Sequence, residues 1–94
     1  MKVERFTIQA CCGRTAIVFK TSRPIIKTDI EKLVSMGWIE FEHFTKAGLL
    51  HVDNPDFSMM GPLGSDRLTV KCKRKQAECT QKLNDLEGLL QQLG

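Results

Sequence analysis

The sequence predicts an α+β domain in which a mostly antiparallel sheet of four to six short strands carries two helices on one face. Several segments alternate apolar and polar residues, as half-buried strands do. Two other segments repeat apolar residues at helical spacing. The connections are of hairpin length, and this favours antiparallel pairing. The length of 94 residues corresponds to a single domain, residues 1–94.

The first two strands are expected at residues 3–10 and 15–20, joined as a hairpin by a turn at Gly13. The second segment is apolar on both faces, as an interior strand would be. In the first segment one set of alternate residues is apolar, and we expect it to face the core. This set is Phe6, Ile8 and Ala10, and the set expected to face solvent is Arg5, Thr7 and Gln9.

A helix is predicted at residues 28–36. Thr28 and Glu31 have the spacing of a capping box, and Gly37 is a typical residue for the end of a helix. Ile30 and Leu33 begin the apolar stripe that should pack on the sheet.

Three or four short strands are expected next, at residues 38–42, 49–52, 57–60 and 67–73, with a loop at 43–48. In the last of them Leu68, Val70 and Cys72 should face inward, with the alternate basic residues outward. We expect this last strand to lie at a border of the sheet, where outward lysines would protect an exposed edge.

The segment "GPLGSD" at residues 61–66 is interpreted as a hairpin turn. It lacks the Gly-Lys-Ser/Thr ending of a phosphate-binding loop, and it leads into a strand instead of a helix. A phosphate site is therefore not predicted there.

The C-terminal segment, residues 76–93, predicts a helix with a dense apolar stripe that ends near Gly94. Gly88 is its one unfavourable residue, at a cost of about 1 kcal/mol relative to alanine. The stripe can cover the chain's own sheet, or part of it can meet a second subunit, with Trp38 as a further exposed contact. The candidate interface residues are Trp38, Leu83, Leu86, Leu90 and Leu93, and Cys79 and Leu89 extend the stripe.

A basic cluster between residues 67 and 75 is the candidate binding site for a polyanion. Its members are Arg67, Lys71, Lys73, Arg74 and Lys75. The net charge of +3 and the pI near 8.8 permit an anionic partner without requiring one. We favour a solvated face whose lysines are neutralised by Glu40 and Glu42 across strands, with polyanion binding as the alternative. Single-strand binders interleave aromatic residues with charge, and most phenylalanines here are expected to face inward.

The cysteines and histidines do not predict a metal site or a cofactor. Cys11, Cys12, Cys72 and Cys79 contain no C-x₂-C pair. Without an export signal we expect reduced thiols, with a disulfide from Cys11 or Cys12 to Cys72 or Cys79 as the alternative.

Catalytic residues are not evident either. His43 and His51 are the only side chains with an ordinary pKa near neutrality, and Asp53 would share a strand face with His51. No nucleophile elbow or oxyanion site accompanies them. We therefore expect a protein that is not an enzyme, with a Cys- or His-dependent activity as the open alternative.

The sequence thus predicts a cytoplasmic, non-enzymatic protein-interaction module for which a homodimer is plausible. The alternative is a module that binds nucleic acid or a small phosphorylated ligand through residues 67–75. No membrane partner is expected, because the longest apolar run, residues 16–19, is too short to span a bilayer.

Overall fold

The computed structural model describes residues 1–9 and 15–93. Six strands form one sheet in the order β1-β2-β6-β5-β4-β3, and every neighbouring pair is antiparallel. The strands are β1 (Val3–Gln9), β2 (Thr15–Thr21), β3 (Ile39–Glu40), β4 (Leu49–Asp53), β5 (Phe57–Pro62) and β6 (Arg67–Cys72). The helices are α1 (Lys27–Ser35), α2 (Glu42–Lys46) and α3 (Gln76–Gln91).

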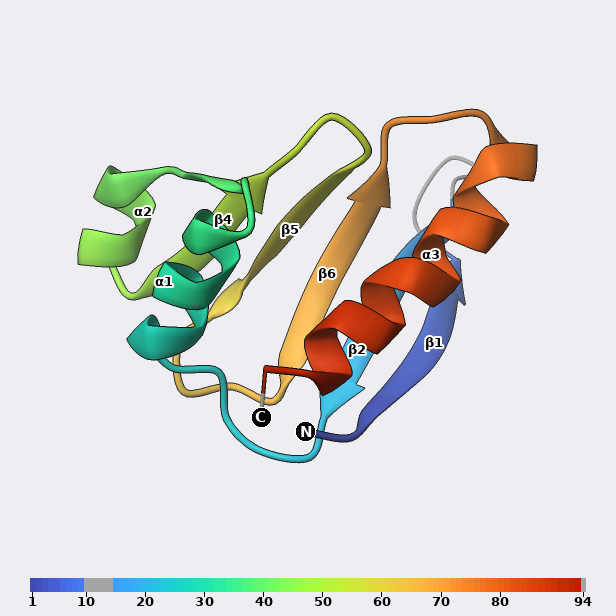
Figure 1. Ribbon diagram of the computed structural model, residues 1–94. Helices are drawn as coiled ribbons and strands as arrows, with labels where there is room; N and C mark the ends of the chain where they lie inside the picture. The colour runs from blue at the N-terminus through green and yellow to red at the C-terminus, as the bar shows by residue number, and fades with distance from the viewer. Residues whose placement is uncertain (10–14, 94) are drawn as a thin grey trace.

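The two longer helices lie on the same side of the sheet, α1 over the β4 end and α3 over β1 and β2 (Figure 1). The predicted α+β fold class, with two helices on one face, is confirmed. The core lies between these helices and the sheet. Many of its most deeply buried side chains come from α1, α3 and four of the strands, among them Ile30, Leu33, Leu90, Phe19, Leu68, Met59, Leu50 and Val52.

The strand β1 presents the opposite face from the one predicted. Arg5 pairs with Phe19 across the ladder, and Phe19 is fully buried on the helix side. Arg5 therefore points toward α3, where its guanidinium contacts Glu87 at 2.8 Å. Phe6 points the other way and is 47% exposed. Alternation defines two faces of a strand but not which face is covered, and the ion pair with Glu87 lets a charged residue lie on the covered face. Ala10, Cys11, Cys12 and the turn at Gly13 lie outside the described residues.

The strand β6 lies inside the sheet, between β2 and β5, so the predicted border position was wrong. The two edges are β1 and the two-residue strand β3. The predicted strand at 38–42 is cut short because residues 42–46 form α2 instead of a loop. The backbone N–H of Phe41 donates to His51 at 3.1 Å, and the Thr45 hydroxyl donates to Glu40 at 2.6 Å. The first bond continues the pairing of β3 with β4 by one residue, and the second connects α2 back to the end of β3.

The helix α1 begins one residue before the predicted start and uses a different cap. Ile26 is its N-cap, and the carboxylate of Asp29 accepts a hydrogen bond from the Ile26 N–H at 3.0 Å. Asp29 is almost completely buried, and Arg23 donates to both of its oxygens at 2.8 and 2.7 Å. The predicted capping box of Thr28 and Glu31 was therefore wrong.

Candidate functional site

The predicted basic cluster does not lie on one continuous surface. Lys73 pairs with Asp53, and the Arg74 guanidinium contacts Asp56 at 2.8 Å. The hydrogen bond from Arg74 holds the pKa of Asp56 below its usual value, and the same bond raises the pKa of Arg74. Two of the five predicted cations are thus neutralised, one by the last residue of β4 and one by the turn between β4 and β5.

The remaining predicted cations are Arg67, Lys71 and Lys75. All three side chains are exposed. None of them forms an ion pair with another residue in the part of the chain that the structure describes. Lys75 is the N-cap of α3 and does not lie on the sheet. Arg67 and Lys71 lie on β6 and point to the side of the sheet opposite α1 and α3, which we call the open face.

A row of mainly apolar side chains crosses the open face from β1 to β4. The ladders place its members opposite one another in neighbouring strands, and the row consists of Phe6, Val18, Thr69, Met60 and His51. We call this set the central row. Phe6 and Met60 are 47% and 41% exposed, so the row leaves apolar surface in contact with solvent. Neither α1 nor α3 covers the central row.

Cations flank the central row on both sides. Lys20 pairs with Arg67 across the β2–β6 ladder on one side, and Lys71 lies on the other side. All three are exposed. Glu4, which pairs with Lys20 in the β1–β2 ladder, is the acidic residue beside them. The open face between β1 and β6 therefore carries more positive than negative charge.

A shallow hollow of about 340 Å³ opens at the β1 end of the central row. Phe6, Thr7, Val18, Lys20 and Arg67 line it. It thus combines an exposed aromatic ring and a β-branched side chain with two cationic groups. This combination suits a flat ring that carries a phosphate, because the ring can stack on Phe6 while the phosphate meets Lys20 or Arg67.

An aromatic cluster closes the other end of the central row. The ring of His51 lies 4.5 Å from that of Phe41 and 4.8 Å from that of Phe44, measured between centroids. His51 Nε2 lies 3.4 Å from the Ser58 hydroxyl, a long hydrogen bond. Asp53 shares the strand face with His51 but pairs with Lys73, so the described residues do not form the His–Asp pair that a catalytic triad requires.

Metal binding finds no support in the part of the chain that the structure describes. There, no group of three or more His, Cys, Asp or Glu side chains lies close enough to hold one ion. Cys72 and Cys79 are joined in a disulfide, so the expectation of reduced thiols was wrong for this pair, as was the alternative pairing with Cys11 or Cys12. A separation of seven residues is short enough for the end of β6 to meet the first turn of α3.

The predicted interface residues lie inside the molecule. Trp38 is only 5% exposed, so the prediction of an exposed tryptophan contact was wrong. The four predicted leucines, three in α3 and one just beyond its end, are buried against the sheet, which is the intramolecular alternative. They are Leu83, Leu86, Leu90 and Leu93. The core of this small domain uses these side chains, and a second subunit cannot reach them without opening it.

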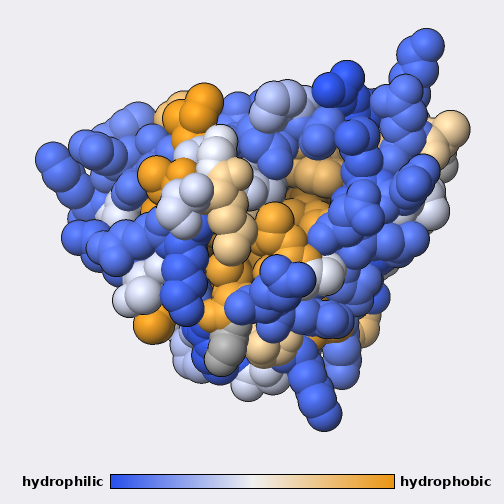
Figure 2. All heavy atoms as spheres, in the orientation of Figure 1, coloured by the Kyte–Doolittle hydropathy of each residue, from blue (hydrophilic) through white to orange (hydrophobic). Residues whose placement is uncertain are grey.

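A second hollow lies on the helix side, where apolar atoms are visible at the bottom of the gap between α1 and α3 (Figure 2). It measures about 180 Å³, and Trp38, Phe57 and Leu86 contribute to its apolar lining. Lys82, Asp56 and Asp85 supply its polar lining. This volume is below the range of about 300–1,000 Å³ that is usual for small-molecule sites. The open face is therefore the better candidate.

Comparison with known proteins gives no family for this chain: no family model matches, and no match is found among curated proteins or solved structures. Within residues 1–9 and 15–93, none of the helices has the length and apolar character needed to cross a bilayer.

Proposed function

We propose that this protein is a non-enzymatic binding module whose open face binds single-stranded nucleic acid. The observation that carries the proposal is the exposed Phe6 ring in one hollow with Lys20 and Arg67. The sequence analysis counted against nucleic-acid binding because most phenylalanines were expected to face the core. Phe6 does not, since it is 47% exposed. Self-association through Trp38 and the α3 leucines has lost its support because those side chains are buried.

The proposed ligand follows from the shape of the open face. The part of the central row that the aromatic cluster leaves open runs from Phe6 to Met60 across four neighbouring strands, a distance of about 14 Å at about 4.8 Å per strand spacing. Such a row suits a short single strand of a few nucleotides. Bases would contact Phe6 and Met60, and phosphates would contact Lys20, Arg67 and Lys71. Because the face is shallow and its cations lie on strands β2 and β6, not on a helix that could enter a groove, we expect a preference for single strands over duplexes.

The first experiment measures the contribution of the aromatic ring. Fluorescence anisotropy with a labelled oligothymidylate or oligouridylate of eight nucleotides at low salt gives the dissociation constant. Phe6→Ala should weaken binding roughly tenfold, which is the loss of affinity expected when one base no longer stacks on an aromatic side chain. Val34→Ala is the matched control, because Val34 is similarly exposed but lies on α1. Equal affinities of Phe6→Ala and the unmodified protein would reject the stacking role.

The second experiment separates local charge from net charge. The double variant Lys20→Glu with Arg67→Glu should lose most of its binding. Lys27→Glu with Lys46→Glu changes the net charge by the same amount, but these exposed lysines lie on α1 and α2. An equal loss in both double variants would show that only net charge matters. A protein that binds neither oligonucleotide at low salt would contradict the proposed function itself.

A further inference from the structure

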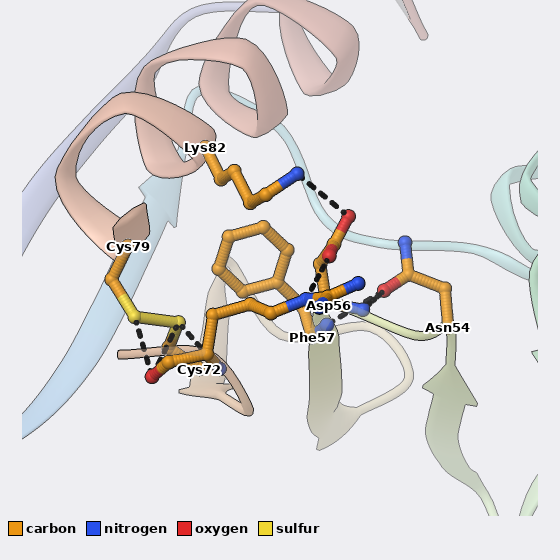
Figure 3. Close-up of a disulfide and its surroundings, with 7 residues drawn as sticks. Asn54, Asp56, Phe57, Cys72, Cys79 and Lys82 are labelled. Atoms are coloured by element: carbon orange, nitrogen blue, oxygen red, sulfur yellow. Dashed lines mark hydrogen bonds and ion pairs between the residues drawn. A yellow bond between two sulfur atoms is a disulfide. The ribbon is translucent and has the colours of Figure 1, made fainter. Parts of the chain in front are cut away.

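The disulfide between Cys72 and Cys79 joins the end of β6 to the first turn of α3 (Figure 3). We propose that this bond is a site of thiol–disulfide exchange with a small thiol, and that its reduction frees the first turn of α3 while the rest of the helix stays packed. The inference is independent of the proposed nucleic-acid binding.

The first turn of α3 has few other attachments. Its N-cap, Lys75, offers no side-chain hydrogen bond to the free backbone N–H groups of the helix. Among residues 77–81, Cys79 alone is buried. The Arg74 and Lys82 pairs with Asp56 are the nearest polar contacts, with Lys82 Nζ at 3.4 Å. All three side chains are partly exposed, and ion pairs of this kind add little stability. The disulfide is therefore the main restraint on this turn.

The later turns of α3 are held independently of the disulfide. Leu83, Leu86 and Leu90 are buried in the core. Arg5 of β1 donates to Asn84 and to Glu87, at 2.8 Å in both cases. These contacts lie at least four residues beyond Cys79, so they remain when the bond is broken.

Access to the two sulfur atoms differs. Cys72 is partly exposed, whereas Cys79 is 9% exposed. An external thiolate should therefore attack Cys72 Sγ, forming a mixed disulfide there and expelling the Cys79 thiolate. Cys79 lies near the N-terminal end of α3, and the positive end of the helix dipole favours an anion there.

The exchange balances in atoms and electrons when the reductant is a dithiol. The second thiolate of the dithiol displaces Cys72 and leaves the dithiol as its own cyclic disulfide. The protein disulfide gains two electrons, the dithiol loses two, and each cysteine thiolate takes a proton from solvent. As a thiol, Cys79 can donate to the carbonyl oxygen of Arg74, which lies 3.2 Å from its sulfur.

The test uses the full chain with Cys11→Ser and Cys12→Ser, which leaves Cys72 and Cys79 as its only cysteines. Hydrogen exchange followed by mass spectrometry compares the air-oxidised protein with protein reduced by dithiothreitol. Amides of residues 78–82 should exchange at least about tenfold faster after reduction, and amides of residues 86–91 should be unchanged. Equal exchange in the two states at residues 78–82, or free thiols in the air-oxidised protein, would overturn the proposal.

A further substitution of Cys72→Ser and Cys79→Ser supplies the control. This variant should exchange like the reduced protein in both buffers, and a response to dithiothreitol in it would overturn the assignment. Brief treatment of the oxidised protein with glutathione, followed by acid quenching and peptide mapping, identifies the attacked sulfur. The adduct is expected on Cys72, and an adduct on Cys79 would overturn the direction of attack.

Discussion

Asp29 is a carboxylate inside the molecule, at the start of α1. Burial alone would raise its pKa, but the hydrogen bonds from Arg23 and from the Ile26 N–H outweigh burial and hold the pKa below its ordinary value. Arg23 also donates to the carbonyl oxygen of Leu93 at 3.2 Å, and Lys32 donates to the same oxygen at 3.1 Å. One ion pair thus connects the start of α1 with the chain beyond α3.

We expect Asp29→Asn to lower the free energy of unfolding by about 2 kcal/mol at neutral pH, because a charged hydrogen-bonded partner of Arg23 is lost. Since the folded pKa of Asp29 is depressed, its contribution is fully present above the unfolded pKa of about 3.9 and disappears as the pH falls through the folded value. Urea unfolding at pH 7, 5 and 2.5 should therefore show a constant difference at the first two values and a smaller one at the third.

Glu31→Gln is the matched control, because Glu31 lies exposed on the same helix. It should change stability by less than about 0.5 kcal/mol at each pH. A difference between Asp29→Asn and the original protein that grows on acidification would contradict the depressed pKa.

The glycines of two elements illustrate opposite constraints. Gly88 lies inside α3, and an added Cβ would meet nothing within 4 Å. Gly61 lies in β5, where an added Cβ would come 2.5 Å from the carbonyl oxygen of Arg67. The helix therefore tolerates a larger residue at Gly88, whereas the β5–β6 ladder needs glycine at position 61.

Replacement by alanine should consequently have opposite signs at these two positions. Gly88→Ala should stabilise the protein by about 0.5–1 kcal/mol, because alanine has the higher helix propensity. Gly61→Ala should destabilise it by about 1–3 kcal/mol through overpacking against Arg67. Thermal unfolding of both variants tests this, and a destabilised Gly88→Ala would contradict the free space around position 88.

The apolar side chains of α3 are buried in the core of the same chain. A substitution there distinguishes this intramolecular packing from a subunit interface. Leu86→Asp places a charge where the side chain is 4% exposed, so it should destabilise the monomer by more than about 3 kcal/mol. Circular dichroism and light scattering of the same sample separate the two cases. A folded variant that merely changes from dimer to monomer would contradict the intramolecular packing.

Local sequence signals predicted the elements well where they depend on neighbouring residues. The stripe from Leu83 to Leu93 predicted α3 to within two residues of its end, because helical periodicity is a property of one segment. The face of β1 was not predictable in this way. Phe6 and Arg5 are adjacent, and the choice between them depends on Glu87, which lies far along the chain.

On the scale of the whole molecule, the strand order is the feature that sequence could not supply. The β2–β6 ladder brings residues 17–20 beside residues 67–70, and no local pattern specifies that pairing. The candidate site depends on it, because Lys20 and Arg67 become neighbours only through this ladder. Sequence therefore identified Arg67 and Lys71 but missed Phe6 and Lys20.

The charge of the open face predicts a salt dependence for the proposed binding. We assume that Lys20, Arg67 and Lys71 each neutralise one phosphate. A plot of the logarithm of the association constant against the logarithm of the salt concentration should then have a slope of about −2. Raising the salt from 50 to 200 mM should then weaken binding about 20-fold. Lys71→Glu should make the slope shallower, and a slope near zero would mean that phosphates are not bound.

The order of elements along the chain also has a consequence for biosynthesis. The first hairpin, β1 and β2, leaves the ribosome early, but α3, which covers its apolar side, is translated after all six strands. Until then Val3 and Phe19 lack the helix that covers them, so this face of the hairpin is exposed to other apolar surfaces during synthesis. The covered face of the first hairpin is therefore completed only after residues 83–93 have been synthesised.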